Sequence, residues 1–334
     1  MDKLSVLYVR YVIIDVSIKS RKNLLKEAIC LEYVLQTHSI YKSYKKVNVL
    51  NGLSMNIPKG AIYGFVGRNG AGKTTLIRMI CGLQFPSGGS FELYGVKNES
   101  KSIAKARARM GAVVETPSIF PNLSAAESLK QQYRYLGIPN YNGIDELLQL
   151  VNLSDTGDKK SRDFSLGMRQ RLGIAVALCG KPDFLVLDEP INGLDPQGII
   201  EIRELILKLN KERNITVLIS SHILDELARL ATHYGFIDKG RIVREMSAEQ
   251  LEKACRKCIR LTVTDTAPLP PVLNATGFDY KIVDDTVIEI YAKPNISRLA
   301  FAFAEKQVEI LSVSEHDEDL EGYFISLVGG ESYE

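Results

Sequence analysis

A glycine-rich segment with one lysine and two threonines is the part of the sequence best suited to bind phosphate. Residues 67–75 fit the pattern G-x-x-x-x-G-K-[ST] at every fixed position. Glycines let the backbone fold closely around an anion and turn its N–H groups inward. Lys73 adds a positive charge for the phosphate oxygens, and Thr74 adds a hydroxyl for Mg²⁺. The segment therefore predicts a site for the phosphates of a nucleotide.

The elements on either side of this segment fit the same interpretation. Residues 61–66 are almost entirely apolar, which is typical of a buried strand, and residues 74–81 carry the apolar spacing of a helix. A helix that begins near Lys73 directs the positive end of its dipole at bound phosphates. A chance glycine-rich turn would not need this strand–loop–helix order, so we interpret the segment as a phosphate loop.

Two carboxylates follow a second apolar run. Residues 184–187 are all apolar, and Asp188 and Glu189 come directly after them. Such a run predicts a strand buried on both faces of a parallel sheet, and ligands bind at the carboxyl ends of these strands. Because a buried carboxylate needs compensation, we expect Asp188 to hold Mg²⁺ and Glu189 to polarise an attacking water. A helix cap or a salt bridge is the alternative for either acid.

A histidine follows the next buried run. Residues 215–220 predict a further strand, and His222 comes just after its end. At this edge of the sheet its ring could hydrogen-bond the γ-phosphate or the attacking water. A purely structural histidine is the alternative.

The order of patterns along the chain predicts the domains. Alternating strands and helices favour a parallel, doubly wound sheet. Residues from about 98 to 165 carry helical patterns, and we interpret them as a helical subdomain inserted between two halves of an α/β core. Beyond Gly240 the pattern changes to that of a small α+β domain without motif chemistry. We therefore expect a core domain at residues 31–240 and an accessory C-terminal domain at residues 241–334.

The first 30 residues are expected to be an extension that is not translated in the cell. Residues 26–28 can be encoded by a ribosome-binding sequence, and it lies a short distance upstream of Leu31, which the alternative start TTG can encode. A genuine but dispensable arm is the alternative. Peptides from residues 1–30 in mass spectrometry of the native protein would contradict the shorter start.

Bulk composition excludes few classes of protein. The chain has 334 residues, of which 45% are hydrophobic and 25% charged, as in ordinary globular proteins. A net charge of +2 argues neither for nor against a nucleic-acid partner. The apolar runs fall well short of the roughly 20 residues that a membrane helix needs, so any membrane role requires spans from another chain. Five scattered cysteines favour a reducing compartment.

Taken together, these motifs resemble the ATP-binding subunit of an ABC transporter. The resemblance covers about residues 32–240 and depends on the order of the phosphate loop, the strand that ends at Asp188, Glu189, the loop around Asp195 and His222. Residues 164–168 stand in the place of the family's L-S-G-G-Q sequence, although Leu166 and Met168 depart from its commonest form. The resemblance implies an α/β fold with a phosphate-loop NTPase core, an antiparallel β subdomain, the inserted helical subdomain and a small C-terminal α+β domain.

The resemblance also implies a role for each matching residue around ATP. Tyr44 would stack on adenine, Glu189 would be the general base, and His222 would sense the γ-phosphate. Thr74 and Asp188 would bind Mg²⁺. The contacts of the phosphate loop with ATP would come from Gly67, Arg68, Asn69, Gly70, Ala71, Gly72, Lys73, Thr74 and Thr75.

Further roles concern the partners. In the family, two copies of the subunit enclose two ATP molecules, so Ser165 and Gly167 would contact the ATP bound to the opposite copy. Asp195 would couple the two sites. Glu115 stands where the family usually has glutamine, and it would lie near Mg²⁺. The loop of residues 115–120 would touch an integral membrane permease.

Three segments resemble one branch of the family more closely. Residues 114–117, residues 164–173 and the end of the chain near Tyr323 and Phe324 are similar to the bacitracin-export and lantibiotic-immunity branch. This implies an ATP-hydrolysing exporter subunit for resistance or immunity to a peptide antibiotic. It would lie at the cytoplasmic face of the cell membrane, held there by its permease. Export of sodium, a lipid or a drug is the alternative.

Two other classes of protein compete with an exporter. A soluble ABC ATPase that works on ribosomes usually has two nucleotide-binding halves, and one that works on DNA carries a long coiled-coil insertion; this chain has neither, so we expect no nucleic-acid partner. A GTPase would need N-K-x-D for guanine, and residues 210–213 fail at the last position, Arg213. A small-molecule kinase is the remaining alternative among phosphate-loop enzymes.

Overall fold

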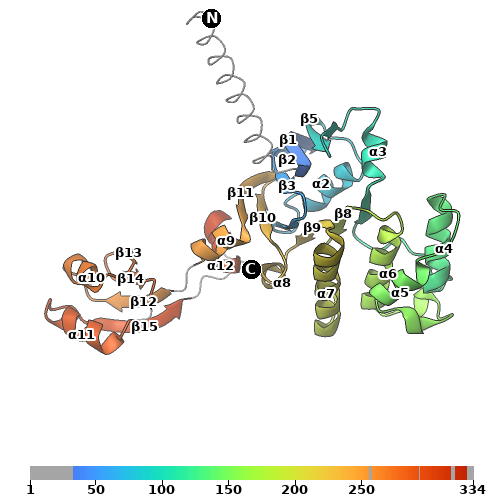
Figure 1. The fold of residues 1–334 in the computed structure, drawn as a ribbon. Coiled ribbons are helices and arrows are strands. Elements are labelled where there is room, and N and C mark those ends of the chain that lie inside the picture. Colours follow the sequence, from blue (N-terminus) through green and yellow to red (C-terminus); the bar gives the residue numbers. More distant parts are fainter. Residues whose placement is uncertain (1–32, 256–257, 293, 317–319, 329–334) are drawn as a thin grey trace, which may run out of the picture.

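A computed structural model describes residues 33–255, 258–292, 294–316 and 320–328 (Figure 1). The expected extension at residues 1–30 therefore lies outside the described residues. In the part of the chain that is described, no helix is both long enough and apolar enough to cross a membrane.

A mainly parallel sheet forms the centre of the larger part of the molecule (Figure 1). Its strands lie in the order β11-β10-β4-β9-β8-β7, and every neighbouring pair is parallel except β10 with β11. The predicted parallel sheet is therefore confirmed. The bounds are β4 (Ile62–Val66), β7 (Met110–Val113), β8 (Phe184–Asp188), β9 (Thr216–Ser221), β10 (His233–Asp238) and β11 (Arg241–Ser247).

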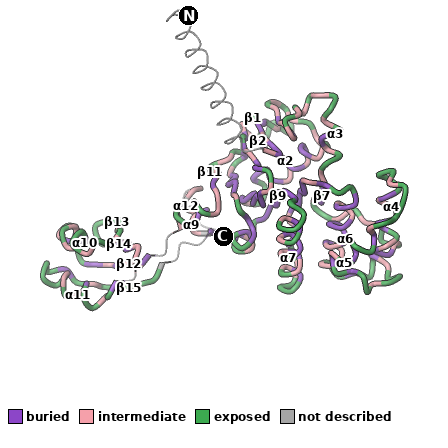
Figure 2. Tube along the Cα trace, viewed as in Figure 1, coloured by how far each residue is buried: buried purple, intermediate pink, exposed green. Residues whose placement is uncertain are grey.

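Both faces of this sheet are covered, as the apolar runs of its central strands predict. Every residue of β4, β8 and β9 is buried. Alternate residues of these strands belong to two different apolar clusters; Leu185 and Leu187 face one of them, and Phe184 and Val186 the other. The buried centre of the sheet stands out in Figure 2. A strand buried in this way can carry polar function only at its ends.

An antiparallel sheet lies on one side of the core. Its strands follow the order β2-β1-β5-β6, and β3 pairs with β1. The bounds are β1 (Tyr33–Tyr44), β2 (Val47–Leu53), β3 (Asn56–Pro58), β5 (Gly88–Leu93) and β6 (Val96–Lys97). Apolar residues of this sheet share one cluster with helix α2 (Lys73–Ile80) and with one face of the central sheet. The helix that follows the phosphate loop is thus fixed between the two sheets.

Helices cover the opposite face and extend from it as a separate group (Figure 1). Helix α4 begins with the expected capping box, in which Ser124 accepts from the Glu127 N–H and the Glu127 carboxylate accepts from the Ser124 N–H. Short 3₁₀ turns at Ser154–Thr156 and Ser161–Asp163 connect α5 to α6. The bounds of these helices are α4 (Ala125–Tyr135), α5 (Ile144–Leu150), α6 (Leu166–Leu178), α7 (Pro196–Arg213) and α8 (Leu224–Ala228). Helix α3 (Ile103–Arg107) lies instead beside β5 and β6, and its Ala106 belongs to the apolar cluster of the antiparallel sheet.

The accessory part forms a small antiparallel sheet with two helices. Its element order is β-α-β-β-α-β and its strand order is β13-β14-β12-β15, which is the split β-α-β arrangement of ferredoxin-like folds. It has its own apolar cluster. The bounds are β12 (Cys258–Val263), α10 (Pro270–Thr276), β13 (Tyr280–Ile282), β14 (Val287–Ile290), α11 (Ile296–Ala304) and β15 (Ile310–His316).

Helices α9 (Ala248–Ala254) and α12 (Leu320–Val328) lie on either side of the accessory part in sequence. Both pack on the core, because Leu251, Leu320 and Phe324 belong to its larger apolar cluster. Strand β11 also continues the central sheet beyond residue 240. The domain boundary at residue 240 stays a prediction, and these three elements beyond it pack with the core.

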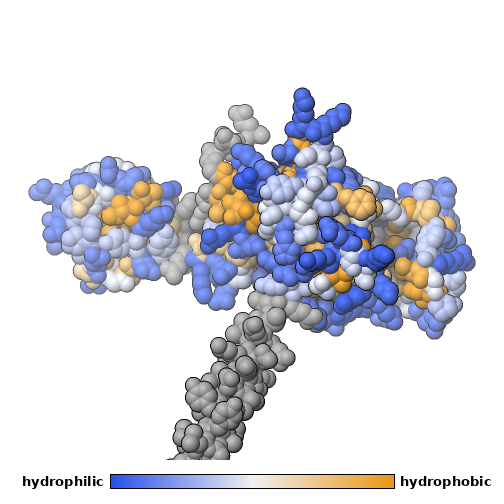
Figure 3. All heavy atoms as spheres, turned by 90° about the horizontal axis from the view of Figure 1, so that it is seen from above, coloured by the Kyte–Doolittle hydropathy of each residue, from blue (hydrophilic) through white to orange (hydrophobic). Residues whose placement is uncertain are grey.

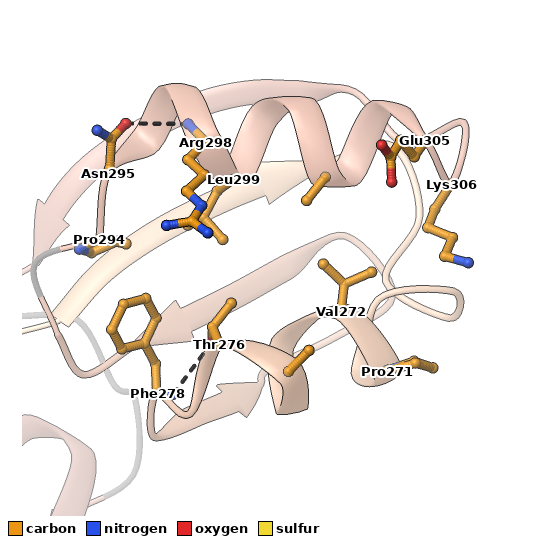
Figure 4. A pocket seen from close by; sticks show the side chains of 12 residues that line it. Pro271, Val272, Thr276, Phe278, Pro294, Asn295, Arg298, Leu299, Glu305 and Lys306 are labelled. Carbon is orange, nitrogen blue, oxygen red and sulfur yellow. Dashed lines mark hydrogen bonds between the residues drawn. The ribbon is translucent and has the colours of Figure 1, made fainter.

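The face of the molecule that Figure 3 shows is largely hydrophilic, with hydrophobic residues gathered in separate groups. In the accessory part, α10 and α11 line a cavity of about 600 Å³ (Figure 4). Phe278 and Leu299 supply apolar surface there, and Arg298 and Lys306 lie on α11 and just after it. None of the predicted nucleotide-binding residues lines this cavity.

Candidate functional site

The phosphate loop connects β4 to α2, at the carboxyl edge of the central sheet. Glycine is required at Gly72, where φ is +110° and a Cβ atom would lie 2.5 Å from Leu50 Cδ2. Gly67 is just as confined, because a Cβ atom there would lie 2.5 Å from a side-chain carbon of Ile237 on β10. The loop is thus packed closely between β2 and β10, and its glycines make this approach possible.

Lys73 is the first residue of α2, as expected, and its side chain is turned back over the loop. It is only 5% exposed. Its ammonium group donates to the Gly67 carbonyl at 2.6 Å and to the Arg68 carbonyl at 3.3 Å. It also pairs with Glu189 Oε1 at 3.2 Å. These contacts hold a buried positive charge at the loop, where phosphate oxygens would find it.

Asp188 ends β8 and is 1% exposed. One of its oxygens, Oδ1, accepts from the Ser220 hydroxyl at 2.6 Å. The other, Oδ2, is buried and has no hydrogen-bond partner among the described residues. A buried carboxylate oxygen without a donor is unfavourable by about 1–3 kcal/mol or more, and a bound cation removes that penalty. The arrangement therefore fits Mg²⁺, with the Thr74 hydroxyl as the second ligand that the sequence predicts.

Glu189 adopts a backbone conformation that is rare for its residue type. Its φ is +49°, a left-handed value that is unfavourable by about 1–3 kcal/mol and is concentrated at functional sites. The Ser220 hydroxyl compensates in part, because it accepts from the Glu189 N–H at 2.9 Å. The carboxylate lies between Lys73 and His222, whose Nδ1 is 2.8 Å from Oε2. The structure thus brings together Lys73, Glu189 and His222, which the sequence predicts separately.

Ser220 is a functional candidate that the sequence analysis missed. It is fully buried at the carboxyl end of β9, opposite Asp188 in the sheet ladder. A single hydroxyl contacts both neighbouring acids, since it donates to Asp188 and accepts from the Glu189 N–H. The available signal was a serine at the end of a buried strand, directly before Ser221 and His222.

The residues expected to act on the opposite copy begin two other helices. Ser165 is the N-cap of α6, and its hydroxyl accepts from the Met168 N–H at 3.2 Å. Asp195 is the N-cap of α7, and its carboxylate accepts from the Gly198 N–H at 3.3 Å. Both residues are exposed. Gly167 lies beside the start of α7, because a Cβ atom there would be 3.9 Å from the Gly198 Cα.

Tyr44 and Glu115 each contact a neighbour within the chain. Tyr44 ends β1, is 42% exposed and donates its hydroxyl to Gln84. Glu115 forms an ion pair with Arg78 of α2, and both side chains are partly exposed. Adenine stacking by Tyr44 and a place for Glu115 near Mg²⁺ stay predictions.

Known proteins resemble this chain over most of its length. Residues 50–192 match the protein family described as "ABC transporter". The bacitracin transport ATP-binding protein BcrA of Bacillus licheniformis is 41% identical over 301 residues, which is 89% of this chain and 98% of that protein. The lantibiotic transport ATP-binding protein SrtF of Streptococcus pyogenes is 41% identical over 223 residues, covering 66% of this chain and 95% of SrtF.

Solved structures agree on the predicted fold class. The cbiO1 subunit of Clostridium perfringens, part of the ABC transporter complex cbiONQ, has a TM-score of 0.60 and 27% identity, covering 66% of this chain and 91% of that one. The dimeric ABC transporter cassette MJ0796 has a TM-score of 0.59 and 25% identity, covering 64% of this chain and 98% of that one.

Proposed function

The chain belongs to the ABC transporter family of ATP-binding proteins, and on that premise we propose that it hydrolyses ATP to drive an exporter for a peptide antibiotic of the bacitracin or lantibiotic type. The observation that carries the hydrolytic part is the carboxylate of Glu189, held between Lys73 and His222 beside the phosphate loop. The names of the relatives support the type of substrate. The transported molecule itself would be recognised by the permease.

The proposed reaction uses residues that are already in contact. Lys73 binds the β- and γ-phosphates of ATP. Glu189 accepts a proton from a water as the water oxygen bonds to the γ-phosphorus, and the bond from that phosphorus to the β,γ-bridging oxygen breaks, giving ADP and phosphate. His222 donates a hydrogen bond to the γ-phosphate, and its contact with Glu189 orients both side chains. Mg²⁺, bound by Thr74 and Asp188, would neutralise the phosphate charge.

A second copy of the chain is proposed to complete each site. Ser165 and Asp195 are exposed, and each begins a helix whose N-terminal end carries a partial positive charge suited to phosphate. The dimeric cassette MJ0796 supports this assembly. We propose that Ser165 and Gly167 of one copy contact the γ-phosphate held by the phosphate loop of the other, and that Asp195 couples the two sites.

A membrane permease is the other proposed partner, which would place this chain at the cytoplasmic face of the membrane. Exposed apolar side chains support a contact surface near the loop of residues 115–120. Phe85 is 81% exposed, Leu83 is 65% exposed and Phe120 is 50% exposed. Leu83 also lines a cavity of about 480 Å³ with Glu115 and Pro117. Large exposed apolar side chains are typical of a surface that another protein covers, and Leu83 connects them to this cavity.

Resistance measurements in cells would test this function. The chain is expressed with its permease, and the minimum inhibitory concentrations of bacitracin and of a lantibiotic are measured. We expect resistance to one of them, and its loss when Glu189→Gln replaces the unaltered chain at equal expression. Equal resistance of the two strains would contradict the proposed role of hydrolysis. Full sensitivity of both strains to these peptides would refute the proposed substrate class.

A further inference from the structure

The last described helix of the chain returns to the nucleotide-binding core after the accessory part (Figure 1). Strand β15 ends at His316, and α12 begins at Leu320. Leu320 and Phe324 are buried in the apolar cluster of the central sheet, and α12 contacts α8, the helix that follows His222. The accessory domain is therefore attached to the core at both ends, and its outgoing end lies beside the candidate site.

Phe324 packs in a cluster of aromatic side chains around Phe236 of β10, the strand that pairs with β4. Its ring lies 6.2 Å from the ring of Phe236 on β10, at an angle of 22°. The ring of Tyr323 lies 5.7 Å from the ring of Phe236 and meets it edge-on. In the parallel ladder between β10 and β4, Phe236 is paired with Val66, the residue just before the loop. Through these contacts α12 supports the strand end from which the phosphate loop starts.

Phe324 also lines a cavity next to the phosphate loop. Phe324 is 1% exposed and forms part of the wall of a cavity of about 200 Å³. The other residues that line this cavity belong to the start of the phosphate loop and to the turn that carries the histidine: Val66, Gly67, Arg68, Asn69, His222 and Leu224. One side chain of α12 thus shares a cavity with both structures that the proposed mechanism assigns to the phosphates.

The histidine turn is held mainly by local contacts and by the burial of Leu224, the first residue of α8. His222 is 35% exposed and contacts Glu189, and the next residue is held by a hydrogen bond from the Ile223 N–H to the Ser221 hydroxyl at 2.9 Å. Removal of the Phe324 ring would enlarge the cavity beneath this turn. When a catalytic group shifts by about 1 Å, the rate of the chemical step falls steeply. The affinity for a nucleotide changes less, because the nucleotide makes many other contacts.

We propose that Phe324 is a positioning residue for ATP hydrolysis, which holds the histidine turn and the start of the phosphate loop in place from the C-terminal helix. The inference rests on the proposed ATPase activity. It also makes α12 the physical connection between the accessory domain and the nucleotide site, because α12 is the element that follows β15 in the chain.

Steady-state kinetics on the full chain with Mg²⁺ and ATP test this role. For Phe324→Ala we expect kcat to fall about tenfold while KM for ATP changes by less than about threefold. Phe324→Leu, which keeps apolar volume but loses the ring, should give an intermediate kcat. Leu320→Ala is the matched control, because Leu320 is buried on the same helix but does not line the cavity. It should lower the melting temperature and leave kcat unchanged.

A second control is Phe301→Ala on α11, whose side chain is 77% exposed; it should change neither quantity. If Phe324→Ala does not fold, the comparison of Phe324→Leu with Leu320→Ala decides. Wild-type kcat in the Phe324 variants, or an equal loss in Leu320→Ala, would overturn the positioning role while the proposed function stands. Absence of turnover in the unaltered chain, with its permease present, would refute the proposed function and this inference with it.

Discussion

Replacement of Ser220 by alanine gives a sharp test of how the site holds its buried acid. Ser220 is fully buried, and its hydroxyl donates to Asp188 Oδ1 at 2.6 Å. The substitution would leave both oxygens of Asp188 without a donor, since Oδ2 already has none among the described residues. The Glu189 N–H would keep a partner, because it also donates to the backbone carbonyl of residue 220 at 3.2 Å. The loss therefore falls mainly on Asp188.

The expected size of this effect follows from the charge of the acceptor. A hydrogen bond to a charged group contributes about 1.5–3 kcal/mol, so we expect Ser220→Ala to lower the free energy of unfolding by about 2 kcal/mol. For a domain of this size that corresponds to a fall of about 4–8 °C in melting temperature. Mg²⁺ with a non-hydrolysable ATP analogue should reduce the difference, because the cation would compensate Asp188.

Thermal unfolding of both forms, with and without Mg²⁺ and the analogue, measures these changes. Ser221→Ala is the matched control. Ser221 is equally buried, but its hydroxyl contacts the neutral backbone of Ile223, so the expected loss is about 1 kcal/mol. Equal melting temperatures for Ser220→Ala and the unaltered chain would refute the assignment of Ser220 as the partner of Asp188. So would equal losses in the two variants.

Three further predictions concern single acids. Glu189→Gln should abolish phosphate release while binding of a fluorescent ATP analogue persists; normal turnover would remove Glu189 as the base. Glu115→Gln should shift the Mg²⁺ dependence of hydrolysis or the coupling of hydrolysis to transport. It should have little effect on the melting temperature, because the ion pair of Glu115 with Arg78 is partly exposed. An unchanged Mg²⁺ titration together with unchanged transport would make Glu115 a neutral variant. The Ser124 N–H and Lys160 lower the pKa of Glu127 to about 2, from an ordinary value of 4.5. The charged carboxylate therefore stabilises the fold above about pH 4.5 and loses this effect as the pH falls towards 2. Between pH 5 and 3 the melting temperature of Glu127→Gln should therefore fall less than that of the unaltered chain. Identical plots of melting temperature against pH for the two proteins would contradict this.

The sequence predicts those parts of the site that lie within a single helix, strand or loop. The glycines of the phosphate loop, the start of α2 at Lys73 and the buried strand that ends at Asp188 each follow from a pattern within about ten residues. Repeated strand–helix patterns likewise predict the parallel sheet. These features are local because spacing and burial of neighbouring residues decide them.

Contacts between distant segments were not predictable in the same way. Ser220 became a candidate only when the ladder between β8 and β9 placed it opposite Asp188. The contact of Tyr44 with Gln84 joins the end of β1 to a segment 40 residues further along the chain. The pairing of Glu115 with Arg78 depends on how α2 packs near the end of β7. Each of these contacts depends on tertiary packing that no spacing within one segment encodes.

Helix α12 shows a missed local signal. Leu320, Phe324 and Leu327 follow the i, i+4, i+7 spacing of an apolar helix face. From the sequence this end of the chain was expected to belong to the accessory domain and to resemble the bacitracin-export and lantibiotic-immunity branch, and no contact with the core was expected. Its return to the core could not have been predicted, because the surface that Phe324 covers is formed by β10 and the turn after β9.

The most direct test of the account is the size of the Glu189→Gln chain in solution with and without ATP, measured by light scattering. The account predicts a dimer in the presence of Mg²⁺ and ATP and a monomer without nucleotide. Addition of Ser165→Arg, which places a bulky side chain at the proposed contact with the opposite copy, should abolish the dimer. It should lower the free energy of unfolding by only about 1 kcal/mol, which is the effect of losing the N-cap of α6. A chain that stays monomeric with saturating ATP, or an unaffected dimer in the Ser165→Arg variant, would contradict the shared nucleotide site.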